Sequence, residues 1–215
     1  MHVKWPGNYT LTGYCTFVLL SVCFGAKDHC PVIPSVHIDA ALKIWNYLRI
    51  DDRPVKSDMI IALGSYDVRV AERAAELWHD RYAEYILFSG KSGNLTRGEN
   101  IRFSYRLLLN RNSLPRDVIL VQKPYMERRK LATFQKQWPG SIGKLYVTSP
   151  QITLLNYPNS EEVDLDDVIT IVISDMQILD SYAKLGYQTF QRIPDDFWSA
   201  YNILHRSGTY NEHQV

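Results

Sequence analysis

Cysteine is nearly absent from the body of this 215-residue chain. Its three cysteines, Cys15, Cys23 and Cys30, all lie near the amino terminus. An odd number at this wide spacing excludes a disulfide framework and matches no zinc-binding pattern. The body of the chain therefore needs no disulfide bond and can fold in a reducing or an oxidising compartment. We expect the protein in the cytoplasm.

An excess of charge of one sign is also lacking. The chain has 24 Lys and Arg against 23 Asp and Glu, which gives a formal net charge of +1. A protein that binds nucleic acid through its phosphates carries a clear basic surplus, so the sequence predicts no nucleic-acid partner. The hydrophobic content of 46% is that of an ordinary protein with a buried core.

Several catalytic and cofactor-binding motifs are missing. Gly90-Lys91-Ser92 has Tyr85 where the phosphate-binding GxxxxGK[ST] loop needs a glycine. No GxGxxG follows Leu63, and no GxSxG occurs. None of the six histidines lies at an expected strand end. The sequence therefore predicts neither a histidine general base nor a histidine-rich metal site.

Long apolar runs are lacking too. Tyr14–Ala26 is mostly apolar, but it is too short to span a bilayer comfortably. It has the length of the apolar part of a signal peptide, although Lys4 is the only side chain before it that is fully positively charged at neutral pH. Three interpretations stay open for the extension formed by residues 1–36: a secretory or anchor signal, a buried accessory segment, or a poorly ordered tail.

The rest of the chain alternates short apolar runs with amphipathic stretches. The runs are too short and too β-branched for helices, so we expect strands. Such alternation predicts a mostly parallel sheet of about five strands, covered by helices on both faces, in a single α/β domain over residues 37–215. The expected strands are Asp58–Leu63, Tyr85–Phe88, Val118–Val121, Leu145–Thr148 and Val168–Ile173. The expected helices are His37–Leu48, Val68–Arg81, Glu99–Leu109, about Met126–Trp138, Ile178–Gly186 and Asp196–Ser207.

Small or polar residues follow the expected strands. Ligands of parallel sheets bind outside the carboxyl ends of the strands, so these residues are binding-site candidates. The two glycines among them allow the backbone to approach a ligand or to adopt a positive φ. The two aspartates are candidate bases or metal ligands, or alternatively loop caps. The candidates are Gly64, Ser65, Asp67, Ser89, Gly90, Lys91, Lys123 and Asp175.

Two arginines begin the helix that follows Val118–Val121. Arg128 and Arg129 lie near its amino terminus, where the helix dipole does not favour cations. Together with free backbone N–H groups they indicate an anion or phosphate site, or else a solvated basic face. We expect Arg129 in the pocket and Arg128 on the solvent side.

The helix Glu99–Leu109 supplies a further candidate. Asn100, Phe103 and Leu107 are spaced i, i+3, i+7, so we expect all three on the face turned to the core. Asn100 would then point inward at the top of the sheet, where its amide can bind a ligand. Alternatively, Glu99 and Asn100 cap the helix, since Glu99 suits its positive end.

With these segments assembled, the chain resembles the bacterial domain-of-unknown-function family that includes the YdcF, SanA and ElyC proteins, its YdcF-like branch especially. The resemblance implies a Rossmann-like three-layer α/β fold with a polar pocket at the strand ends. The pocket would include Gly64, Ser65, Ser89, Gly90, Glu99, Asn100 and Arg129. The matching segments are Leu63-Gly64-Ser65, Ser89-Gly90, Gly98-Glu99-Asn100, Val121–Arg129 and Ala132-Thr133-Phe134.

The chain departs from this family in several places. Lys91 replaces the second glycine of the family's Ser-Gly-Gly, and Met126 stands at its usual histidine position, as in the YdcF-like branch. The family has a helix and another strand where Gly93 and Gly98 are here nearly adjacent. About one helix–strand unit, on the order of 30–40 residues, is therefore expected to be missing. Loss of an edge strand is survivable, whereas loss of an inner strand would expose unpaired edges.

These observations lead to three hypotheses of function. The first is a small-molecule-binding protein or enzyme with a pocket for a nucleotide-like or anionic ligand. The resemblance makes S-adenosylmethionine the specific candidate. The second is a membrane-associated cell-envelope factor, anchored through Tyr14–Ala26. The third is an inactive interaction module. The substrate, the reaction and the oligomeric state stay open.

Overall fold

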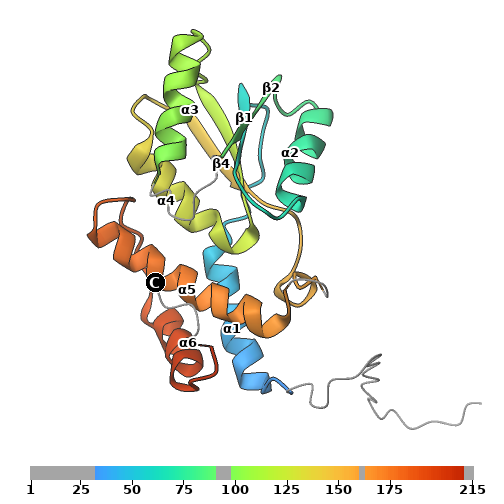
Figure 1. The fold of residues 1–215 in the computed structure, drawn as a ribbon, viewed down its shortest axis with the longest axis vertical. Coiled ribbons are helices and arrows are strands. Elements are labelled where there is room, and N and C mark those ends of the chain that lie inside the picture. Colours follow the sequence, from blue (N-terminus) through green and yellow to red (C-terminus); the bar gives the residue numbers. More distant parts are fainter. Residues whose placement is uncertain (1–31, 91–97, 160–162, 211–215) are drawn as a thin grey trace, which may run out of the picture. The chain divides into compact units, whose positions relative to one another are not determined.

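The computed structural model describes residues 32–90, 98–159 and 163–210 (Figure 1). The chain divides into two units at Val32, and everything below concerns the unit Ile33–Val215. Lys91, the interval between Gly93 and Gly98, and Tyr14–Ala26 fall outside the described residues. Within the described ranges, no helix is long and apolar enough to cross a membrane.

A parallel sheet forms the centre of this unit. Its strands are β1 (Met59–Leu63), β2 (Tyr85–Ser89), β3 (Asp117–Val121) and β4 (Lys144–Thr148), in the order β2-β1-β3-β4. The chain moves from β1 to β2 on one side and then crosses back to β3 and β4 on the other. The strand order therefore reverses between β1 and β3, the position at which open parallel sheets bind their ligands.

Helices cover both faces of the sheet (Figure 1). On one face, α2 (Arg69–His79) packs its buried Val70, Ala74 and Leu77 against alternate residues of β1 and β3. On the other face lie α3 (Glu99–Asn110) and α4 (Glu127–Gln137). The predicted Rossmann-like three-layer α/β fold is confirmed.

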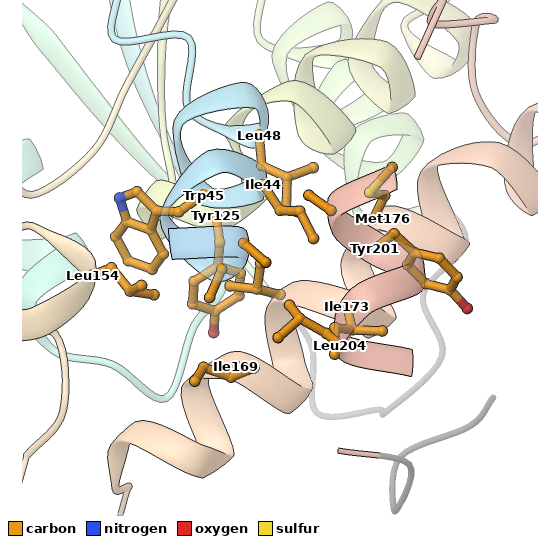
Figure 2. Packing of buried hydrophobic residues seen from close by; sticks show 14 of the residues in the cluster. Ile44, Trp45, Leu48, Tyr125, Leu154, Ile169, Ile173, Met176, Tyr201 and Leu204 are labelled. Atoms are coloured by element: carbon orange, nitrogen blue, oxygen red, sulfur yellow. The ribbon is translucent and has the colours of Figure 1, made fainter. Parts of the chain in front are cut away.

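A cluster of helices forms a further core. It consists of α1 (Ser35–Leu48), α5 (Leu165–Lys184) and α6 (Asp195–Arg206), with the short 3-10 turns η1 (Pro124–Met126) and η2 (Leu154–Asn156). Figure 2 shows Ile44 and Leu48 of α1 facing side chains of α5 and α6. Because η1 directly follows β3, the buried side chain of Tyr125 joins this cluster to the sheet.

The prediction of a fifth strand at Val168–Ile173 is wrong, because these residues lie within α5. Asp164 and Asp167 form a capping box, in which each side chain accepts a hydrogen bond from the other's backbone N–H. The buried stripe continues beyond the β-branched run, through Met176 and Leu179. Packing against the helical cluster thus overrides the strand propensity. Four strands, rather than about five, make up the sheet among the described residues.

The predicted inner face of α3 is also wrong. Phe103 and Leu107 are exposed, and the buried residues are Ile101, Ser104 and Leu108. The i, i+3, i+7 pattern fits both stripes equally well, so spacing alone cannot choose between them. β2 is an edge strand, and among the described residues no further strand lies beside it. The stripe with Phe103 and Leu107 therefore has no strand to pack against and stays exposed.

Candidate functional site

The two glycines at the ends of β1 and β2 pack against each other. The N–H of Gly64 donates to the carbonyl of Ser89 at 2.5 Å. A Cβ added to Gly64 would lie 2.9 Å from the Cα of Gly90, which is closer than real Cβ atoms come. Neither glycine is among those with a positive φ. Glycine is needed here for the close approach of two loops, rather than for the positive φ that the sequence allowed.

A hollow of about 430 Å³ opens beside these glycines at the ends of β1 and β2. It brings together five predicted site residues, and it also contains two exposed aromatic rings, Tyr66 and Phe88. Its predicted members are Gly64, Ser65, Asp67, Ser89 and Gly90, and its apolar wall includes Ala62, Val70 and Ala71.

The hydroxyl of Ser89 ties β2 to α3. It lies 2.7 Å from the hydroxyl of Ser104, and both hydroxyls are within hydrogen-bond distance of the Asn100 carbonyl, at 3.2 and 2.8 Å. Asn100 therefore joins this group through its backbone. Glu99 is exposed on the first turn of α3. The Ser65 hydroxyl accepts from the N–H of Asp67 at 3.0 Å and so orders its own loop.

Asp67 is fully engaged by its neighbours. Its two oxygens pair with Arg69 at 2.8 and 2.9 Å, and the Tyr157 hydroxyl donates to it at 2.6 Å. Burial raises the pKa of Asp67, but the hydrogen bonds from Arg69 and Tyr157 outweigh this and hold the pKa below its ordinary value. Asp67 also accepts from the N–H of Arg69 at 3.1 Å. Of the interpretations that the sequence left open, this geometry fits a loop cap.

Arg129 and Asp175 form a buried ion pair. The Arg129 Nη2 atom lies 2.9 Å from the Asp175 Oδ1 atom, and both side chains are largely shielded from solvent. Asp175 lies in the middle of α5 rather than at the end of a strand, which corrects its predicted position. Burial raises the pKa of Asp175, against the opposing effect of Arg129. Arg129 therefore pairs with Asp175 in this structure and does not present a free charge to a ligand.

Lys123 follows the end of β3 and is close enough to Asp67 and Asp175 for both charges to act on it. Burial lowers the pKa of Lys123, and the charges of Asp67 and Asp175 act against this. Its ammonium lies 5.9 Å from the centre of the Tyr125 ring. Among the described residues, no carboxylate oxygen pairs with it within 4 Å. Lys123 is therefore a partly buried cation near two acids that are already held by arginines.

Lys130 adds a further cation that sequence reasoning missed. Burial, together with the charge of Arg129, lowers the pKa of Lys130 to about 7. The cluster around Lys123 contains more cations than acids, and we call it the switch-point cluster. It consists of Asp67, Arg69, Lys123, Tyr125, Arg129, Lys130, Tyr157 and Asp175.

Arg128 is not on the solvent side as predicted. Its Nε donates to the carbonyl of Tyr47 at 2.7 Å, and its guanidinium lies 4.4 Å from the centre of the Tyr47 ring. It therefore fastens α4 to α1. Of the residues that the sequence did not reveal, Tyr157 directly follows the short turn η2, where no periodicity marks it, and Lys130 lies within α4. Tyr66 was recoverable, since it lies between Ser65 and Asp67, both candidates already.

No group of three or more His, Cys, Asp or Glu side chains within the described ranges is arranged to hold a metal ion. No family model matches the chain. Among curated proteins, it is similar to an uncharacterized protein of Streptomyces coelicolor, SCO4629. The two are 31% identical over an alignment of 209 positions, and the match covers 81% of this chain and 93% of the Streptomyces protein.

Proposed function

Since this chain belongs to the same family as SCO4629, whose name assigns no activity, we propose from its own site that it binds a small, nucleotide-like anionic ligand. The ligand would lie at the carboxyl ends of β1, β2 and β3. The observation that carries this proposal is Lys123, a partly buried cation with no carboxylate paired to it among the described residues, at the point where the strand order reverses.

The charge of the switch-point cluster favours an anion. Arg69 and Arg129 already neutralise the two carboxylates, Asp67 and Asp175. Lys123 and, below about pH 7, Lys130 remain as surplus positive charge in a partly buried place. A bound phosphate or carboxylate would replace lost hydration and supply the missing counter-charge.

The neighbouring hollow favours a planar ring. Tyr66 is 91% exposed although it lies in the hollow beside Asp67, and the ring of Phe88 lies exposed in the same hollow. Exposed aromatic rings beside an apolar wall offer stacking surfaces for a base. Asp67 belongs to both the hollow and the switch-point cluster, so the two adjoin. A ligand could therefore place a ring in the hollow and an acidic group at the cluster.

S-adenosylmethionine is the specific candidate that the resemblance to the YdcF-like proteins brings. It combines an adenine ring with a carboxylate, but its sulfonium and ammonium groups give it a net positive charge, so the surplus cations of the site favour a phosphate-bearing nucleotide over it.

The experiment is a thermal-shift and calorimetry panel with the full chain, using S-adenosylmethionine, nucleoside monophosphates and triphosphates, phosphosugars and inorganic phosphate. A ligand that binds the folded state raises the melting temperature by mass action. We expect a response from at least one nucleotide-like compound, and Lys123→Met should weaken its binding about tenfold or more, the worth of a charge-assisted hydrogen bond. Tyr66→Ala should weaken it several-fold.

Matched control variants exist for both substitutions. Lys136→Met removes an exposed charge from α4, and Phe190→Ala removes an exposed ring elsewhere, so both should bind as the wild type does. Silence across the panel from a folded protein would refute the proposal and favour an interaction module. Equal losses from Lys123→Met and Lys136→Met would indicate only diffuse electrostatics. A membrane anchor through Tyr14–Ala26 stays a prediction, to be checked by fractionation.

A further inference from the structure

The outer edge of β2 is unpaired among the described residues. β2 pairs with β1 alone, and Ser89 turns its carbonyl to β1, where it accepts from Gly64. Because backbone groups alternate along a strand, the N–H and C=O groups of Ile86 and Phe88 point away from the sheet. An open row of this kind is a template for pairing with another strand.

The opposite edge of the sheet is protected. Asp52 lies against β4, where its N–H donates to the Val147 carbonyl at 3.1 Å and its carboxylate accepts from the Val147 N–H at 3.0 Å. β4 also begins with an exposed lysine, Lys144. Charges and side-chain pairing are the usual means of blunting an edge. The five residues of β2, by contrast, include no charge and no proline.

Apolar side chains extend this open edge into a patch. Tyr85 of β2 is 58% exposed and lies on the α3 side of the sheet, whereas the exposed ring of Phe88 lies on the α2 side, in the hollow at the strand ends. On α3, which packs beside β2, Phe103 is 55% and Leu107 is 43% exposed, one turn apart on the same stripe. Tyr85 and Leu107 also line a hollow of about 610 Å³ between β2 and α3. Grouped exposure of this kind marks an interaction site, whereas single exposed residues do not.

We propose that this face binds a second copy of the same chain, with β2 pairing antiparallel to β2 of the partner copy about a two-fold axis. In the register that places Leu87 opposite its own equivalent, Ile86 faces Phe88 of the other copy. The outward backbone groups of these two residues then satisfy one another. The two sheets become one continuous sheet, and the exposed stripes of α3 meet across the axis.

The chemistry of the patch suits self-association. A two-fold interface places each patch against itself, so a patch of one sign would repel its partner. This one has charges of both signs at its margin, Glu84 and Arg111, which line the hollow between β2 and α3. Large side chains carry about 150–250 Å² each, so the exposed parts of Tyr85, Phe103 and Leu107 amount to roughly 250–300 Å² per copy. With the paired strands, two copies approach the roughly 1,000 Å² of a specific interface.

The experiment is sedimentation velocity on the full chain over a wide range of concentration. We expect a species of about twice the 24.9 kDa monomer mass. The double variant Phe103→Glu/Leu107→Glu should weaken dimerisation at least tenfold and leave the far-UV circular dichroism spectrum unchanged, since both side chains are exposed. The matched control is Leu109→Glu, an exposed leucine on the other side of the same helix, which should remain dimeric.

Cross-linking tests the register independently. Leu87→Cys, in a chain whose three native cysteines are replaced by serine, should form a disulfide between copies, because Cα atoms in a non-hydrogen-bonded antiparallel pair lie about 4.5 Å apart. Glu76→Cys on α2 should not cross-link. A wild type that stays monomeric throughout would overturn the proposal. So would a dimer that Phe103→Glu/Leu107→Glu leaves intact, or a dimer in which Leu87→Cys does not cross-link.

Discussion

At the scale of single residues, Arg129 shows how a correctly chosen residue can have a different partner from the one expected. The helix position and the paired arginines indicated an anion, and an anion is indeed bound, but it is the carboxylate of Asp175. A buried charge finds a partner within the fold whenever one is in reach, because leaving it alone is costly. The surplus cation of the site is instead Lys123, which the strand-end pattern includes among the candidates but does not distinguish from the others.

Removal of Arg129 should therefore affect folding. In Arg129→Ala, the buried Asp175 loses its counter-ion, and we expect the free energy of unfolding to fall by about 3–5 kcal/mol. Urea denaturation measures this. The double variant Arg129→Met/Asp175→Leu should recover most of the loss, because it leaves no charge behind. A single-variant loss below about 1 kcal/mol would contradict the pair and free Arg129 for a ligand.

Glu127 should make stability depend on pH. Its Oε2 atom accepts from the N–H groups of Ile50 and Asp51 at 2.6 and 2.7 Å, and its side chain is buried. Burial raises the pKa of Glu127 from 4.5 to about 7, so between these values the folded state holds a proton that the unfolded state has released. Its contribution to stability is present below pH 4.5 and is lost as the pH rises through about 7.

Glu127→Gln removes this titration, so its unfolding free energy should vary less between pH 5 and pH 8 than that of the wild type. The difference cannot exceed about 1.4 kcal/mol per pH unit for one proton. Urea titrations of both proteins at unit steps of pH would measure it. Parallel pH profiles would mean that Glu127 ionises normally.

At the scale of elements, α5 is the clearest case in which tertiary packing overrides local secondary-structure propensity. A run of β-branched residues predicts a strand, yet the same residues complete one long buried stripe against α1 and α6. The start of this helix was recoverable from the sequence, since Asp164 and Asp167 have the spacing of a capping box. The β-branched run that follows is the stronger local signal, and it predicts a strand instead.

The capping box provides a direct test of α5. Asp164→Ala should lower the free energy of unfolding by about 1 kcal/mol, because it removes the side-chain acceptor for the Asp167 N–H. Asp166→Ala is the matched control. It lies in the same first turn beside two other acids, which raise its pKa along with burial, so its removal should be neutral or slightly stabilising. Thermal denaturation compares the two. Equal losses would show that charge at the helix end matters more than the cap.

At the scale of the whole molecule, the helical cluster and the sheet meet at the site. Tyr125 and Tyr157 are buried in the helical cluster, and their rings lie 5.4 Å apart beside Lys123 and Asp67. Ligand binding at the switch-point cluster would therefore involve both cores. We expect the two cores to unfold together.

Ile44→Ala tests this coupling. Ile44 is fully buried among α1, α5 and α6, so its truncation should cost about 2–5 kcal/mol. Trp45 reports on the helical cluster and Trp138 on the sheet core. With each tryptophan as the only probe in turn, both transitions should shift equally. Val36→Ala, at a half-exposed position of α1, should change little. A shift confined to the Trp45 signal would make the two cores independent.

By itself, the sequence determined the layered parallel architecture, the four strands that form and the loops that end them. These features depend on local information, since a short apolar run between turn residues can be buried in few other ways. Gly64, Ser65, Asp67, Ser89 and Gly90 lie together in one hollow, because parallel strands place their carboxyl ends together.

Only the tertiary structure decided which residues each helix and each charged side chain contacts. Which stripe of α3 turns inward, whether a β-branched run becomes α5, and which carboxylate holds Arg129 all depend on residues far away in the chain. Burial and ion pairing are properties of the assembled fold, because they are set by what excludes water around a side chain. For that reason Lys123, rather than Arg129, stands out as the cation with which a ligand would pair.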